Sequence, residues 1–146
     1  MFSIRIRTIG EAFCLLVFTF CLVSCDENKP KSVKTKFSCY SHGNALRADF
    51  VSEAYQTFGP TNFYQKVVIT KKSNDTSETV LKMDHGYNVR LEWKGDKLLK
   101  IIYPEGARIH NYTNFFHSDQ SIRIHLSFSE SKKGSFTDLN EGCLNN

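Results

Sequence analysis

Five histidines and one His-Ser-Asp run are the residues of this sequence whose types could support metal binding or hydrolysis. A zinc or copper site needs three or four converging ligands, usually including a pair two to four residues apart. His117 and Asp119 form the one close pair of this kind in the sequence. The sequence therefore predicts no metal site and no cofactor. The histidines are His42, His85, His110, His117 and His125.

The run His117-Ser118-Asp119 has the residue types of a hydrolytic triad. Consecutive residues do not provide the triad geometry, because a triad collects its members from separate elements. The sequence also lacks a Gly-x-Ser-x-Gly motif, which would mark a nucleophile elbow. We therefore predict no catalytic residues and no enzymatic activity. The alternative is a small hydrolase whose site has no recognisable motif.

The first 24 residues have the organisation of an export signal. Arg5 and Arg7 form a basic segment, and twelve mainly apolar residues follow from Ala12 to Val23. A bilayer-spanning helix needs about 20 apolar residues. A basic head, a short apolar stretch and a small residue beyond it are typical of a signal peptide. The sequence thus predicts a signal peptide over residues 1–24.

The residues Leu22-Val23-Ser24-Cys25 resemble the lipobox of bacterial lipoproteins. The resemblance implies that the Cys25 thiol carries diacylglycerol, that the signal is cut before it, and that the new amine is acylated. Two or more acyl chains hold a protein stably in the bilayer. The resemblance therefore implies a lipoprotein of the cell envelope, anchored in the membrane through Cys25. The alternative is an ordinary secretory signal with Cys25 close to the cleavage site.

Asp26 directly follows the lipidated cysteine. In enteric-type Gram-negative bacteria, an aspartate at this position retains such lipoproteins on the inner membrane. For such a host the resemblance implies that Asp26 is a sorting signal and that the protein faces the periplasm. In a host with a single membrane, the same sequence would give a cell-surface protein.

Two cysteines remain after the signal, Cys39 and Cys143. An even pair in an exported chain favours a disulfide. The bridge would close a loop of roughly 100 residues, for which the chain-entropy model gives about 4–5 kcal/mol. The alternative is two unpaired thiols in a host without an oxidising machinery at its surface.

The charge of the mature chain argues against a nucleic-acid partner. The whole chain has 19 basic and 15 acidic residues, and removal of the signal leaves 17 and 14, a net charge of +3. These charges are scattered and form no strongly basic patch. They support no more than a weak attraction to anionic lipid head groups.

The remaining chain divides into a tether and one domain. Residues 25–36 begin with the lipidated cysteine and continue as a polar, lysine-rich segment, which predicts a flexible tether. From residue 37 to residue 146 the apolar residues mainly alternate with polar ones, as Ile122, Ile124 and Leu126 do. Turn clusters separate such stretches, including Gly95-Asp96. This pattern predicts an all-β domain, an antiparallel small sandwich or incomplete barrel. Carboxylates that alternate with basic residues are expected on solvated outer faces; they are Asp49, Glu53, Glu92 and Glu105.

Residues 45–58 fit two elements. Leu46, Phe50, Val51 and Ala54 follow a helical stripe, whereas Leu46, Ala48 and Phe50 also alternate as in a strand. A strand is favoured because the neighbouring elements are strands, and one helix is the alternative.

Residues 40–105 also weakly resemble small uncharacterised exported bacterial β-proteins. The resemblance lies in the turn that separates Val89–Trp93 from Leu98–Tyr103. That resemblance implies a β-fold and no activity.

Asn111-Tyr112-Thr113-Asn114-Phe115-Phe116 combines aromatic and amide side chains without clean alternation. Such side chains are typical of contact surfaces. The sequence therefore predicts a contact patch at Asn111, Tyr112, Asn114, Phe115 and Phe116. In the alternative, Phe115 and Phe116 only straddle the core at the end of a strand.

We expect the protein to act as a binding, inhibitory or accessory module whose partner is another envelope protein. The second hypothesis is a small envelope hydrolase.

Overall fold

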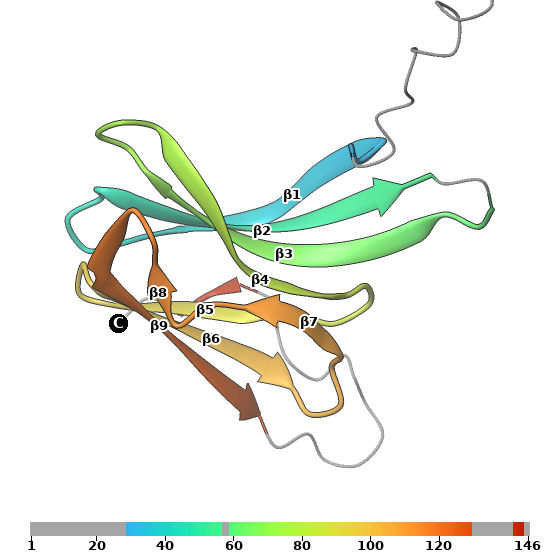
Figure 1. Cartoon of the computed structure of the whole chain (residues 1–146). Coiled ribbons are helices and arrows are strands. Elements are labelled where there is room, and N and C mark those ends of the chain that lie inside the picture. Colours follow the sequence, from blue (N-terminus) through green and yellow to red (C-terminus); the bar gives the residue numbers. More distant parts are fainter. Residues whose placement is uncertain (1–28, 57–58, 130–141, 145–146) are drawn as a thin grey trace, which may run out of the picture.

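Two β-sheets packed face to face make up the computed structural model of the chain, which describes residues 29–56, 59–129 and 142–144 (Figure 1). The predicted all-β sandwich is confirmed, and none of the described residues is helical. The described residues form ten strands: β1 (Ser32–Tyr40), β2 (Leu46–Tyr55), β3 (Asn62–Lys71), β4 (Thr76–Asp84), β5 (Arg90–Lys94), β6 (Leu98–Pro104), β7 (Ile109–Tyr112), β8 (Phe115–Phe116), β9 (Asp119–Ser129) and β10 (Gly142–Cys143).

The first sheet has the strand order β1-β2-β3-β4-β7 and is antiparallel throughout, as predicted. Short turns join β1 to β2 and β3 to β4. The β3–β4 turn spans residues 72–75, and Asp75 in it has a positive φ of 53°. Asparagine and aspartate tolerate this left-handed conformation better than most residues, so Asp75 suits its position in the turn.

The second sheet has the order β10-β5-β6-β9-β8 and is mixed, which differs from the predicted purely antiparallel pairing. Strands β5 and β6 form the predicted antiparallel hairpin at Gly95, whose φ is 67°. Strand β9 runs parallel to β6, and β10 runs parallel to β5. The β6–β9 pair is parallel because the chain leaves β6, crosses to the other sheet as β7 and returns through β8, so no hairpin joins the two strands.

Inward-facing residues of both sheets form one continuous core. Phe50 from β2 and Ile101 from β6 are fully buried, and the alternation along β9 buries Ile122 and Ile124. Phe37 on β1 packs against the ring of Phe50 with their centroids 5.4 Å apart. The other members of this core are Cys39, Leu46, Ala48, Val67, Ile69, Val80, Leu81, Met83, Val89, Leu91, Trp93, Leu99 and Phe116.

The segment with two possible elements is a strand. β2 pairs with both neighbours along its length, and it places Leu46, Ala48 and Phe50 in the core. Val51 points to the opposite face of the strand, and it is also buried, with only 6% of its surface exposed. The helical stripe arises because both faces of this central strand are covered. Residues 57–58 lie outside the described part of the chain.

Two predictions made from polarity, one boundary and one set of exposed residues, are wrong. β1 begins at Ser32, so five residues assigned to the tether belong to the sandwich. Lysines on an exposed edge strand do not prevent pairing, because their side chains reach water while the backbone bonds to β2. Three outer-face carboxylates expected to be solvated are buried: Asp49, Glu53 and Glu92 are 7–8% exposed. Neighbouring side chains cover them, as described below for Glu53.

Candidate functional site

The predicted contact patch lies where the chain passes from one sheet to the other. β7 is the last strand of the first sheet, and β8 is the last strand of the second. Residues 111–117 therefore connect the two sheets along one side of the sandwich. We call Asn111, Tyr112, Thr113, Asn114, Phe115 and His117 the crossover surface, because these six residues line one shallow depression of about 520 Å³.

Amide and aromatic groups dominate the crossover surface. Asn111, Asn114 and His117 are exposed, and Tyr112 is 46% exposed. The half-buried ring of Phe115 packs against the His117 ring with their centroids 4.9 Å apart. The depression is thus open to solvent and offers both hydrogen-bonding groups and aromatic faces.

Phe116 does not belong to this surface, which corrects one residue of the predicted patch. Its side chain is fully buried in the core between the sheets. Adjacent residues of a strand point to opposite faces, so Phe115 and Phe116 share one strand while only Phe115 reaches the surface. For these two phenylalanines the structure shows the alternative: they lie on the two sides of β8, and only Phe116 points into the core.

Backbone hydrogen bonds fix both sides of the depression. The N–H of Thr113 donates to the carbonyl oxygen of Val80 on β4 at 3.0 Å. The N–H of Ile124 on β9 donates to the carbonyl oxygen of Asn114, also at 3.0 Å. The Thr113 hydroxyl in turn donates to the Phe115 carbonyl oxygen. Because the first two bonds go to different sheets, the loop between β7 and β8 is held from both sides.

Glu78 on β4 holds the turn that follows β8. Its carboxylate accepts the N–H groups of His117 at 2.7 Å and of Ser118 at 2.8 Å, and it also accepts the Ser118 hydroxyl. Partial burial alone would raise the pKa of Glu78. The hydrogen bonds outweigh burial, so the pKa is lower than that of an ordinary glutamate.

Asp119 makes a second contact between the sheets. Its carboxylate accepts hydrogen bonds from the Ser121 hydroxyl at 2.7 Å and from the Lys71 ammonium at 3.0 Å. Lys71 ends β3 in the first sheet, and Asp119 begins β9 in the second. The Ser121 bond, followed by the Lys71 bond, lowers the pKa of Asp119 to about 2.

The residues of the His-Ser-Asp run are therefore engaged in contacts that hold the turn and the sheets. The Ser118 hydroxyl donates to Glu78 rather than to an imidazole, and Asp119 bonds Lys71 and Ser121. A serine nucleophile instead needs a hydrogen bond to a base. Across residues 29–56, 59–129 and 142–144, no three His, Cys, Asp or Glu side chains form a group that could hold a metal ion.

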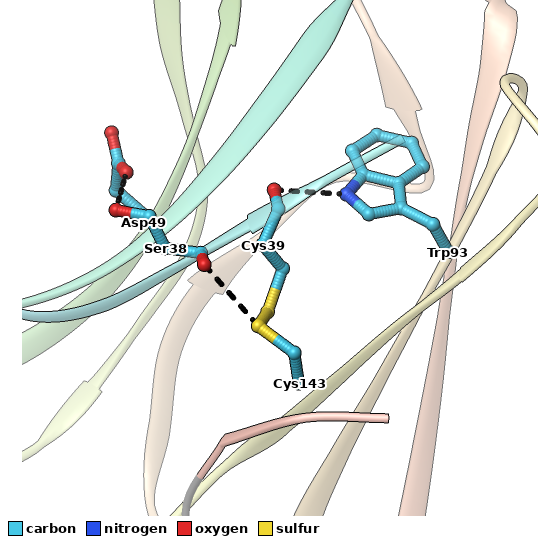
Figure 2. Close-up of a disulfide and its surroundings, with 5 residues drawn as sticks. All are labelled: Ser38, Cys39, Asp49, Trp93 and Cys143. Carbon is cyan, nitrogen blue, oxygen red and sulfur yellow. Dashed lines mark hydrogen bonds between the residues drawn. A yellow bond between two sulfur atoms is a disulfide. The ribbon is translucent and has the colours of Figure 1, made fainter. Parts of the chain in front are cut away.

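The opposite edge of the sandwich is closed by the predicted disulfide between Cys39 on β1 and Cys143 on β10 (Figure 2). Cys39 is buried, Cys143 is exposed, and their Cα atoms are 5.6 Å apart. The Trp93 indole N–H donates to the carbonyl oxygen of Cys39 at 3.2 Å, so β5 also contacts this edge. The N–H of Leu144 donates to the Leu91 carbonyl oxygen at 2.9 Å and continues the pairing beyond β10.

An aromatic and charged cluster on the outer face of the first sheet has no counterpart in the sequence predictions. Glu53 pairs with Lys66, and its carboxylate accepts the Tyr55 hydroxyl at 2.7 Å. Burial and the bond to Glu53 raise the pKa of Tyr55. The Lys82 ammonium lies 4.0 Å from the centroid of the Tyr64 ring. These groups contact one another across β2, β3 and β4, so the cluster stabilises the face of the sheet.

The predicted lipidation and sorting residues, Cys25 and Asp26, lie outside the described residues. Among the residues that the structure describes, no helix is long and apolar enough to span a membrane. Comparisons of the chain with protein-family models, with curated proteins and with solved structures find no match. The geometry of the described residues is thus the observation from which a function can be inferred.

Proposed function

We propose that this protein is a lipid-anchored module of the bacterial cell envelope that binds another envelope protein through its crossover surface. The observation that carries this proposal is the shallow depression lined by amide and aromatic side chains. Tyrosine and phenylalanine supply contact area, and asparagine supplies adaptable hydrogen bonds. Because both sheets fix the loop, little backbone ordering is needed when a partner binds.

The open shape of the depression favours binding over hydrolysis. A small hydrolase needs a cleft in which a nucleophile, a base and an orienting group converge. At the crossover surface the nearest carboxylates, Glu78 and Asp119, accept bonds that hold the turn and join the sheets. The depression itself is lined by amides, two aromatic rings and one imidazole, which suit recognition of a protein surface.

The anchor in this proposal is Cys25, with the lipid bilayer as its first partner. Labelling cells with a palmitate analogue should mark the wild-type protein, and Cys25→Ser should remove the label. Cys21→Ser is the matched control, because Cys21 is removed with the signal and its loss should leave the label intact. A labelled, membrane-bound Cys25→Ser protein would contradict the anchor.

The sorting residue is tested separately in an enteric-type host. We expect wild-type protein in the inner-membrane fraction of a density gradient, and Asp26→Ser should move it to the outer-membrane fraction. The retained Glu27 provides a control, since Glu27→Gln should leave the distribution unchanged. Wild-type protein in the outer membrane would contradict the role of Asp26.

The binding surface is tested by paired substitutions. Tyr112→Ala with Asn114→Ala should abolish recovery of the partner from detergent-solubilised membranes after cross-linking. Tyr40→Ala is the control, because Tyr40 is 51% exposed and lies at the opposite edge of the sheet. Both variants should keep the wild-type melting temperature to within a few degrees, so that a loss of binding reports on the surface.

A further inference from the structure

The described strands bring several of their ends together at the end of the sandwich where β1 begins. We call this the tether end. Ser32 pairs with Ala54, and Ala54 pairs with Phe63, so β1 and β3 start and β2 ends here. β5 also begins at this end, because the N–H of Tyr87 donates to Gln65 on β3 at 3.1 Å. β6 runs antiparallel to β5 and β9 runs parallel to β6, so both end here (Figure 1).

Exposed apolar side chains gather at the tether end. Five large apolar or aromatic side chains of the described residues are exposed: Val33, Tyr40, Phe63, Tyr112 and Phe128. Three of them, Val33, Phe63 and Phe128, belong to strand ends at the tether end, and they are 56%, 50% and 59% exposed. An end enriched in exposed apolar side chains indicates a surface that contacts something other than water.

Phe63 and Phe128 continue the inner faces of the two sheets beyond the core. Along β3 the inward positions Val67 and Gln65 are fully buried, and Phe63 is the next inward position. Along β9 the inward Ile124 is 4% exposed, and Phe128 lies four residues further on. The facing sheet no longer covers either ring. Both phenylalanines therefore present apolar surface at the rim of the sandwich.

Basic side chains lie just before β1 and along its first five residues, at and beyond this apolar rim. Lys29, Lys31, Lys34 and Lys36 lie within eight residues that contain no carboxylate. All four side chains are exposed. The backbone N–H of Lys31 donates to the carbonyl oxygen of Ala54, and Ala54 pairs with Phe63. Lysines beside exposed aromatics are the combination that binds anionic membrane surfaces: the aromatics enter the interfacial layer and the ammonium groups approach the head groups.

We propose that the tether end rests on the lipid bilayer, with Phe63, Phe128 and Val33 in the interfacial layer. This inference rests on the proposed anchor at Cys25. Six residues separate Cys25 from Ser32, and the seven Cα–Cα steps between these two residues span at most about 25 Å when fully extended. The turn that follows β8, beside the crossover surface, then points away from the membrane, because β9 runs from Asp119 at that turn to Ser129 at the tether end. An eleven-residue strand spans about 35 Å.

Tryptophan fluorescence of the full-length protein in vesicles with brominated acyl chains and anionic head groups tests this orientation. Trp93 is the only tryptophan of the chain and is 7% exposed, so it gives a constant, unquenched background. We expect Phe63→Trp and Phe128→Trp to add emission that the brominated lipid quenches and that is shifted to the blue. Tyr40→Trp, the control at the opposite end of β1, should add emission that is not quenched.

Flotation of the same vesicles separates two failures. Protein that floats but shows no quenching at Phe63→Trp and Phe128→Trp, or equal quenching at Tyr40→Trp, overturns the orientation and leaves the anchor intact. In that case the rim faces a protein or water. Protein that does not float overturns the anchor, and the proposed orientation falls with it.

Discussion

The sandwich is closed at its two edges by different chemistry. At one edge a disulfide joins β1 to β10, which otherwise pairs with β5 through two residues. At the other edge the β4 carboxylate of Glu78 and the salt bridge between Lys71 and Asp119 join the sheets. A covalent bond constrains the unfolded chain, whereas carboxylate contacts act in the folded state and depend on their ionisation. The disulfide should therefore respond to reductant, and the contacts of Glu78 and Asp119 should respond to acid.

This difference also separates the roles of the edges. The disulfide edge carries no part of the crossover surface, whereas the carboxylate edge holds the turn that contains it. Stability and binding should consequently be separable by substitution. The following predictions test that separation, from the largest expected effect to the smallest.

Removing the disulfide should have the largest effect on stability. Cys39→Ser with Cys143→Ser opens a bridge of 104 residues in sequence separation. The chain-entropy model gives a loss of about 4–5 kcal/mol in the free energy of unfolding. Urea denaturation measures the loss, and reductant should destabilise the wild-type protein without affecting the double variant. Equal stability of the two proteins would show that this edge is held by its strand pairing.

The adjacent phenylalanines of β8 provide a matched comparison of core and surface. Phe116→Ala removes a fully buried ring and should cost about 3–5 kcal/mol in the free energy of unfolding. Phe115→Ala truncates a half-buried ring and should cost about 1 kcal/mol while weakening partner binding. Urea denaturation of both variants gives the comparison. A cost for Phe115→Ala equal to that for Phe116→Ala would place Phe115 in the core.

Glu78→Gln should make the carboxylate edge less sensitive to acid. The pKa of Glu78 is lowered in the folded state, so its contribution to stability is full above the unfolded pKa and is lost as the pH falls through the folded pKa. We expect the variant to be about 1–2 kcal/mol less stable at pH 7. The difference in melting temperature from the wild type should shrink below about pH 4. A difference that is constant with pH would contradict a role for the charge.

Asp119 should show the smallest effect on stability but the clearest titration. Its folded pKa of about 2 lies below the ordinary value, so its contribution is lost between about pH 4 and pH 2. NMR titration of the carboxyl group should give that low value. Lys71→Met should raise the pKa toward that of an ordinary aspartate. Lys72→Met is the control, since the Lys72 ammonium bonds Asn44 and not Asp119. An unchanged pKa in Lys71→Met would leave Ser121 as the sole cause.

The disulfide and most strands could be predicted from the sequence because each depends on a local or countable signal. Alternation predicted β9, the turn at Gly95-Asp96 marked the hairpin of β5 and β6, and the even pair after the predicted export signal predicted the bond between Cys39 and Cys143. The parallel β6–β9 pair could not be predicted, because it depends on which sheet the intervening strands join. β7 and β8 have four and two residues, too few for a periodic pattern.

The sequence predicted which residues form the candidate site, but not the contacts that hold them in place. The amides and aromatics of residues 111–116 stood out, and all but Phe116 line or border the depression. Glu78 lies about 40 residues away in sequence from the turn that it holds, so no local pattern connects them. Its place at the start of β4 gave no sign that its carboxylate crosses to the other sheet. Long-range polar contacts of this kind are set by the register of both sheets together.

Site-specific photo-cross-linking in living cells tests the central claim most directly. A photoreactive phenylalanine analogue at Tyr112 or Asn114 should give, after irradiation, one discrete adduct with the same envelope protein. The analogue at Tyr40, which is equally exposed but lies at the disulfide edge, should give none. Adducts from Tyr112 and Asn114 that are absent from Tyr40 support binding through the crossover surface. No adduct from either crossover position, or the same adduct from Tyr40, would contradict it.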